Sequence, residues 1–309
     1  MRPTLFHIGL GRHPFEVHSY GFLIAMGLLV GVALAVRRGR SVGIPTGATL
    51  DLTFYAIVFG MLGSRLVYVV THAGDYARLC TGAGVPRSLG QRLFDCTAAL
   101  HVWQGGLVFL GGAVLAAVTT LLFARRKQLG LGLVADVLAP SVSIAHVFGR
   151  LGCFMVGCCY GKPWPSGVRF PKGSVAFDEL LAKGMFLREA TATYGLHPTQ
   201  IYEAGGELLI FLVLVWLWRR RHTPGTVALA YAVGYGLLRF VVEIFRGDEA
   251  RGYLFQVRIP GLAAALALPP NEPLFLSSAQ ATALLLMGFG SVGYFLLRRR
   301  VPGPAARQS

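Results

Sequence analysis

The sequence predicts an all-α integral membrane protein with seven transmembrane helices. Three observations support this prediction. First, 54% of the 309 residues are hydrophobic and only 14% are charged, whereas charged residues make up about a quarter of a typical soluble domain. Second, the chain contains apolar runs of about 20 residues, and each run can cross the roughly 30 Å hydrocarbon core of a bilayer as a helix. Third, basic clusters follow every second run.

The apolar runs place the predicted helices along the chain. The first run is longer than the apolar part of a signal peptide and is followed by its basic residues, so we expect it to remain as a helix. We interpret residues 1–309 as a single polytopic membrane domain. The helices are expected at about 17–36, 50–71, 99–123, 131–156, 200–218, 227–245 and 277–297.

The net charge of +15 is explained by membrane topology. Clusters of basic residues follow the first, third, fifth and seventh runs, so the positive-inside rule predicts the N-terminus outside and the C-terminus in the cytoplasm. A nucleic-acid-binding protein would instead carry a basic face with stacking aromatics on a soluble fold, and we expect no nucleic-acid partner. The clusters lie at residues 37–40, 125–127, 219–221 and 298–300.

Polar side chains lie near the outer ends of the first two runs. Residues 1–16 show no periodicity and are expected at the outer surface, leading to His18 and Tyr20. Tyr20 alone is typical of an aromatic-belt anchor. Arg65 in the second run is placed either to extend to the headgroups or to meet a lipid phosphate inside the protein.

The third and fourth runs combine close-packing glycines with reactive groups. Glycine pairs at 105–106 and 111–112 allow another helix or an acyl chain to approach closely. His146, Arg150 and Cys153 are spaced i, i+4 and i+7 and therefore share one helix face. Because a charge inside a membrane run costs about 2.5 to 3.5 kcal/mol, Arg150 indicates a site.

Residues 157–196 form the longest segment that is not apolar, and we expect them to make a head region outside the membrane. The fifth helix then places Gln200, Glu203 and Glu207 at i, i+3 and i+7. Carboxylates inside a bilayer require cationic partners. The sequence therefore predicts that these side chains meet basic residues of another helix.

The sixth helix supplies such partners. Tyr235, Arg239, Glu243 and Arg246 form one stripe at i, i+4, i+8 and i+11. A structural ion pair is one interpretation of Arg239 with Glu243. Together with Arg150, however, the arginines exceed what one glutamate requires, and guanidinium groups match phosphate oxygens. Phosphate is therefore the predicted missing anion.

The five cysteines all lie in predicted outside loops or near outer helix ends, where disulfides can form. Cys80 and Cys96 enclose a loop of suitable length for a disulfide. A disulfide between Cys158 and Cys159, or between loops, is also left open. The spacing of these two residues and Cys153 matches none of the usual zinc-binding frames, so we expect no metal site.

In order along almost the whole chain, several blocks resemble the prolipoprotein diacylglyceryl transferases of bacterial inner membranes. The resemblance implies transfer of the diacylglyceryl group of phosphatidylglycerol to the lipobox cysteine thiol in a prolipoprotein signal peptide, with glycerol phosphate released and no cofactor. It also implies a multi-pass protein of the bacterial inner (plasma) membrane with a periplasmic head. The blocks are HSYG, GSRLVYV, WQGGLVFLGG, GRLG with GCCYG, HPTQIYE and YGLLRFVVEIFR.

The resemblance also implies roles for individual residues. Arg150 and Arg239 correspond to the lipid-phosphate and catalytic arginines, and Tyr20 to a further catalytic position. Glu243 and Arg246 correspond to an ion pair of the sixth helix. The full set expected to bind substrate is Arg150, Gly161, Glu243, Arg246, Arg65, His197 and Glu203.

The chain departs from the family pattern where a proton acceptor is usual. Leu110 stands where the family usually has a histidine, and Cys153, Val156 and Cys158 replace residues of the GRLGN and NGE patterns. His101 lies nine residues before Leu110, about 13.5 Å along a helix axis, and does not substitute for it.

Three interpretations remain: an active enzyme with another base or a pre-formed thiolate, a related transferase with another acceptor, or a degenerate lipid-binding paralogue. Nearby arginines lower the pKa of a thiol, which favours an active enzyme. A transporter is disfavoured because the sequence lacks repeated halves with matching broken helices.

Overall fold

The computed structural model describes residues 4–10, 13–81, 97, 106, 108–187, 189–220, 223–247, 252–266, 268 and 273–300. The chain divides into two compact units. The first contains Met1–Ala35 and Ala135–Ser309, and the second contains Val36–Val134.

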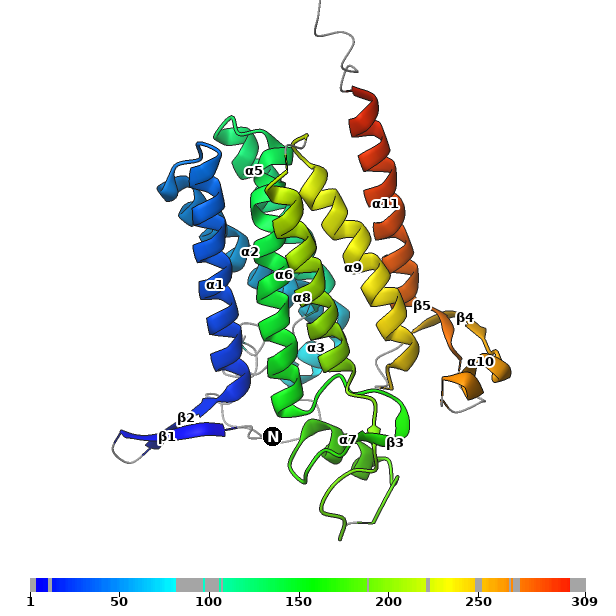
Figure 1. The fold of residues 1–309 in the computed structure, drawn as a ribbon. Coiled ribbons are helices and arrows are strands. Elements are labelled where there is room, and N and C mark those ends of the chain that lie inside the picture. Colours follow the sequence, from blue (N-terminus) through cyan, green and yellow to red (C-terminus); the bar gives the residue numbers. More distant parts are fainter. Residues whose placement is uncertain are drawn as a thin grey trace, which may run out of the picture. The chain divides into compact units, whose positions relative to one another are not determined.

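Seven helices are long and apolar enough to cross a membrane, which confirms the predicted all-α membrane fold (Figure 1). Only 17–39% of the most apolar window of each helix is buried inside the protein. Helices with so much exposed apolar surface suit lipid rather than water. They are α1 (Ser19–Ser41), α2 (Thr46–Thr71), α5 (Phe109–Arg126), α6 (Leu131–Val156), α8 (Thr199–Trp218), α9 (Thr226–Phe245) and α11 (Ser278–Arg300).

In the second unit, glycines bring α2 and α5 into close contact, as the sequence predicts for small residues. A Cβ at Gly63 would lie 2.5 Å from the carbonyl oxygen of Gly111, and a Cβ at Gly112 would lie 2.9 Å from that of Gly60. A short helix, α3 (Ala73–Thr81), follows α2. The predicted glycine surface is therefore used for packing between these two helices.

The predicted start of the third transmembrane helix at residue 99 is wrong, because α5 begins at Phe109. Gly106 has a left-handed backbone with φ +71°, and Val108 is extended. The Val108 N–H donates to the carbonyl oxygen of Ser64. The sequence is largely apolar on both sides of Gly106, so composition alone does not show where α5 begins. His101 is not part of α5 and lies outside the described residues.

In the first unit, α8 packs on α9, and α9 packs on α11. Helix α1 approaches α6 at Gly27, where a Cβ would lie 2.7 Å from that of Phe148. The carboxylate of Asp136 in α6 accepts hydrogen bonds of 2.8 Å from the N–H groups of Gly225 and Ala228. Asp136 thus satisfies free N–H groups at the start of α9, where a negative charge is favourable.

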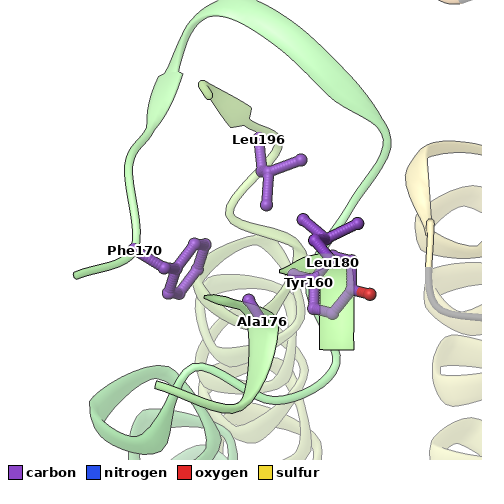
Figure 2. Close-up of a cluster of buried hydrophobic side chains, with 5 residues drawn as sticks. All are labelled: Tyr160, Phe170, Ala176, Leu180 and Leu196. Carbon is purple, nitrogen blue, oxygen red and sulfur yellow. The ribbon is translucent and has the colours of Figure 1, made fainter. Parts of the chain in front are cut away.

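Residues 157–196 contain the strand β3 (Pro163–Val168) and the helix α7 (Val175–Ala182). Ser174 caps α7 by accepting a hydrogen bond from the Phe177 N–H. The segment has its own apolar cluster, whose side chains Figure 2 shows as sticks. The cluster consists of Tyr160, Phe170, Ala176, Leu180 and Leu196.

Two small hairpins add to the helices. Residues 1–16 show no periodicity in the sequence, but most of them form a hairpin in which β1 (Thr4–Leu10) pairs antiparallel with β2 (His13–His18). Between α9 and α11, β4 (Tyr253–Val257) pairs with β5 (Phe275–Ser277) around the short helix α10 (Pro260–Ala265). Neither hairpin was predicted from the sequence.

Candidate active site

Six ionisable residues of the first unit gather where three helices meet. Helix α6 contributes His146 and Arg150, α8 contributes Glu203 and Glu207, and α9 contributes Arg239 and Glu243. In each helix the two residues are four positions apart, so both point to the same face. The three carboxylate residues are 3% exposed or less, and burial at this level requires close charged partners.

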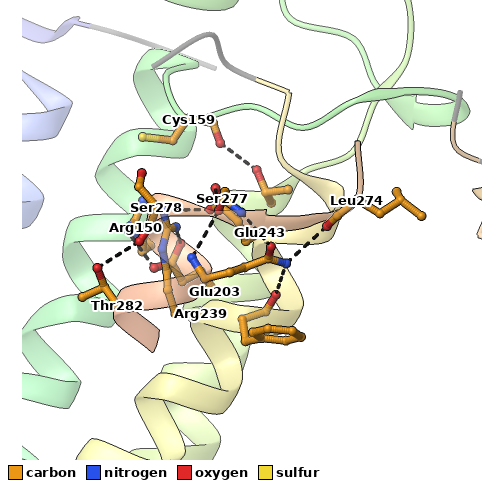
Figure 3. Close-up of polar contacts among 12 residues, drawn as sticks. Arg150, Cys159, Glu203, Arg239, Glu243, Leu274, Ser277, Ser278 and Thr282 are labelled. Carbon is orange, nitrogen blue, oxygen red and sulfur yellow. Dashed lines mark hydrogen bonds and ion pairs between the residues drawn. The ribbon is translucent and has the colours of Figure 1, made fainter. Parts of the chain in front are cut away.

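Glu203 lies between the two arginines that the sequence predicts to bind a phosphate. Its Oε1 atom is 2.8 Å from Nη2 of Arg150, and its Oε2 atom is 3.7 Å from Nη1 of Arg239. Figure 3 shows these three side chains together. Among the described residues, the buried Nη1 of Arg239 has no hydrogen-bond partner. One buried carboxylate therefore holds two guanidinium groups at one site, and one N–H group of this pair stays available.

Arg239 also contacts Glu243, with 2.9 Å between Nη2 and Oε2. The Ser277 hydroxyl donates a 3.1 Å hydrogen bond to the other oxygen of Glu243. The predicted ion pair between Arg239 and Glu243 is therefore present. The pairing of Glu243 with Arg246, which the resemblance implies, stays a prediction.

The predicted excess of arginines over glutamate is smaller than expected, because three carboxylates rather than one lie at this site. The charge count alone therefore does not require a further anion. The charges compared are those of three arginines, Arg150, Arg239 and Arg246, and three glutamates, Glu203, Glu207 and Glu243.

His146 and Glu207 form a hydrogen-bonded pair that was not predicted from the sequence. Nδ1 of His146 is 2.8 Å from Oε1 of Glu207, and Nε2 of His146 accepts a 3.1 Å hydrogen bond from Nε of Arg150. A neutral imidazole with its proton on Nδ1 satisfies both contacts. The Ser143 hydroxyl donates a 2.6 Å hydrogen bond to Glu207, and Tyr231 contacts it at 3.5 Å.

Two sequence signals indicated this pair. His146 lies four residues before Arg150, and Glu207 lies four residues after Glu203. These spacings place His146 on the same helix face as Arg150, and Glu207 on the same helix face as Glu203. The contact between His146 and Glu207 depends on how α6 packs on α8, which residue spacing along the sequence does not show.

Gly161 lies where three backbone segments meet. Its N–H donates to the carbonyl of His197, and it forms an isolated antiparallel bridge with Arg246. A Cβ at Gly161 would lie 2.5 Å from that of His197 and 2.7 Å from the Phe245 carbonyl oxygen. Only glycine fits this approach. The structure thus joins three predicted site residues, Gly161, His197 and Arg246, through their backbones.

The His197 side chain is fixed by aromatic contacts. Its ring stacks on Trp164 with 4.7 Å between centroids, and its Nδ1 atom is 3.2 Å from the Tyr202 hydroxyl. Burial and the charge of Lys162 lower the pKa of His197. His197 is therefore favoured as a neutral, well-oriented group beside Gly161.

Tyr20 begins α1 beside the last turns of α6. A Cβ at Gly152 would lie 3.0 Å from Cδ2 of Tyr20. The Tyr20 side chain is therefore near the end of α6 that also carries Arg150 and Cys153.

Arg65 belongs to the second unit and is buried there. Its Nη1 atom donates a 3.2 Å hydrogen bond to the carbonyl of Gly106. Its guanidinium group also lies over the rings of Tyr68 and Tyr76. These contacts favour a position inside the protein over the extension to the headgroups that the sequence left open.

Cys153, Cys158 and Cys159 are free cysteines, so the disulfide between Cys158 and Cys159 that the sequence left open is absent. Their Sγ atoms all lie within 4.8 Å of one another. Hydrogen bonds from the other two thiols, followed by the charges of Arg246 and Arg150, lower the pKa of Cys159. The predicted disulfide between residues 80 and 96 involves side chains outside the described part of the chain.

Comparison with known proteins places this chain in a family. The sequence matches the family model for prolipoprotein diacylglyceryl transferase over residues 3–296. A relative from Clostridium tetani is 30% identical over 251 residues, covering 80% of this chain and 86% of the relative. Relatives from Parasynechococcus marenigrum and Rhodococcus jostii are 30% and 32% identical, covering 96% and 82% of this chain and 94% and 68% of the relatives. All three are named phosphatidylglycerol–prolipoprotein diacylglyceryl transferase.

Proposed function

Since the chain belongs to the prolipoprotein diacylglyceryl transferase family, we propose that it transfers the diacylglyceryl group of phosphatidylglycerol to a lipobox cysteine of a prolipoprotein. The near-full-length match to relatives with this printed name supports both substrates. The observation that carries the proposal is the pair of partly buried arginines, Arg150 and Arg239, held on both sides of the buried Glu203.

The reaction requires the cysteine sulfur to attack the glyceryl carbon that carries the phosphate. A carbon–sulfur bond forms, the carbon–oxygen bond to phosphate breaks, and glycerol phosphate leaves. Negative charge develops on the departing phosphate oxygen, and fixed guanidinium groups stabilise such charge. Arg150 and Arg239 suit this role because the Glu203 carboxylate fixes their position before substrate binds.

The thiol proton needs an acceptor, and the histidine usual in the family is Leu110 in this chain. We assign this role to His146. Its Nε2 atom carries the lone pair in the tautomer described above, and Glu207 at Nδ1 is placed to stabilise the imidazolium that forms. A phosphate that binds Arg150 would compete with Nε2 for the guanidinium group and release Nε2 for the proton.

Purified protein in detergent should convert a lipobox peptide to its diacylglyceryl thioether when phosphatidylglycerol is supplied. The measurements are the mass of the peptide and the amount of glycerol phosphate released, and the control is the same peptide with serine at the acceptor position. If the protein binds phosphatidylglycerol but shows no turnover, the alternative of a degenerate lipid-binding paralogue holds.

We also propose that residues 157–196 form a periplasmic head of a single polytopic domain in the bacterial inner membrane, with the N-terminus outside. The basic clusters after alternate helices support this orientation. In a background without native cysteines, Lys172→Cys should react with a membrane-impermeant maleimide in intact spheroplasts. Lys127→Cys, also exposed but in a basic cluster, should react only after lysis. The reverse pattern would overturn the orientation.

A further inference from the structure

The three cysteines at the end of α6 converge on one point. Cys153 lies in the last turn of the helix, and Cys158 and Cys159 lie in the loop that follows it. Gly157 turns the chain with φ +83°, and the N–H groups of Gly157 and Cys158 both donate to the carbonyl of Cys153. This turn folds the loop back on the helix and brings all three Sγ atoms within 4.8 Å of one another.

Two side chains at the start of α8 hold the loop in this conformation. Gln200 donates a 2.6 Å hydrogen bond to the carbonyl of Cys158, and Thr199 donates a 2.6 Å hydrogen bond to that of Cys159. Figure 3 shows the contact to Cys159. Cys159 adopts a left-handed backbone with φ +58°, which is unfavourable for a residue with a Cβ. Strained backbone of this kind persists where the surroundings impose it, and it is frequent at functional sites.

The arrangement suits a cation that prefers sulfur ligands. Zinc–sulfur bonds of about 2.3 Å in a tetrahedral site place the sulfur atoms about 3.8 Å apart, so shifts of about 1 Å or less complete the geometry. A ligand set made only of thiolates selects Zn²⁺, Cd²⁺ or Cu⁺ over cations that prefer oxygen. Three thiolates with a divalent cation leave one negative charge, and the positive charge of Arg150, three residues before Cys153 in α6, can offset it.

We propose that Cys153, Cys158 and Cys159 bind one Zn²⁺ or a similar thiophilic cation. Such a cation would join the last turn of α6 to the start of the 157–196 head, and it leaves a fourth position for water. The site goes beyond the proposed transfer reaction, because no step of that reaction passes through it. Sequence spacing argued against a metal because the usual frames rely on regular turns, whereas here left-handed residues at 157 and 159 bring the thiols together.

The test is binding of Cd²⁺ and Zn²⁺ to the full chain, purified in detergent, reduced, stripped of metal and freed of any affinity tag. We expect one equivalent of Cd²⁺ per chain, with thiolate-to-cadmium charge-transfer absorption in the ultraviolet, and displacement of Cd²⁺ by excess Zn²⁺. Cys158→Ser and Cys153→Ser should each abolish the absorption. The matched control Cys80→Ser/Cys96→Ser should keep it.

Two results would overturn the site. One is a lack of cation binding by the native protein, or charge-transfer absorption that persists in both cysteine variants. The other is a native protein, purified without reductant, in which mass spectrometry finds two of these three cysteines joined by a disulfide. Size-exclusion profiles and circular dichroism of each variant show whether lost binding reflects the missing thiol or a misfolded protein.

Discussion

Replacing Arg150 by glutamine should lower the rate of diacylglyceryl transfer by at least about a hundredfold, the usual loss when one fixed donor to a developing negative charge is removed. Arg150 is held 2.8 Å from the buried Glu203 and is therefore positioned before the lipid binds. Arg239→Gln should have an effect of the same order, because its buried Nη1 has no hydrogen-bond partner among the described residues. Initial rates with phosphatidylglycerol and a lipobox peptide measure both effects.

Loss of folding needs to be separated from loss of phosphate binding. Arg150→Gln leaves Glu203 with less compensating charge, and breaking a buried ion pair costs about 3 to 5 kcal/mol. The double variant Arg150→Gln/Glu203→Gln removes the uncompensated carboxylate, so it should recover thermal stability without recovering transfer. Arg125→Gln, at the exposed end of α5, is the matched control. Near-normal turnover in both single arginine variants would show that neither guanidinium binds the phosphate.

Sequence reasoning worked where one helix determines the answer. Apolar length predicted all seven helices, and spacing predicted that Arg239 and Glu243 share a face, as their 2.9 Å contact confirms. It failed at the start of α5, because a left-handed Gly106 and an extended Val108 precede the helix within an otherwise apolar run. The N-terminal hairpin was missed because short strands carry a weaker periodic signal than long helices.

The spacing of residues along the sequence did not predict the contacts between helices. The sequence placed His146 and Arg150 on one face but did not identify Glu207 of another helix as the partner of His146. It also did not show that the Sγ atoms of Cys153, Cys158 and Cys159 lie within 4.8 Å of one another, since the left-handed backbone of Cys159 has no signal in the residue types. In both cases the residues were correctly noticed, and only the three-dimensional packing supplied their partners.

His146→Gln should lower transfer by about a hundredfold, within the range that general acid–base catalysis contributes. Glutamine keeps an N–H group that can donate to Glu207, so the variant removes the proton acceptor with little change to the surrounding contacts. Initial rates with phosphatidylglycerol and a lipobox peptide, compared for the native protein and the variant under the same conditions, measure the loss.

The same assay with further variants decides whether Leu110 marks a changed base or a lost one. If His146 is the acceptor, Leu110→His should leave the native rate largely unchanged, because the reaction already has a base. Ser143→Ala removes a 2.6 Å hydrogen bond to Glu207 and serves as a positioning control, with a smaller loss of rate. A His146→Gln variant with near-native turnover would exclude this residue as the base. A native protein that is inactive, beside an active Leu110→His variant, would mean that the base was lost and that this chain binds lipid without transferring it.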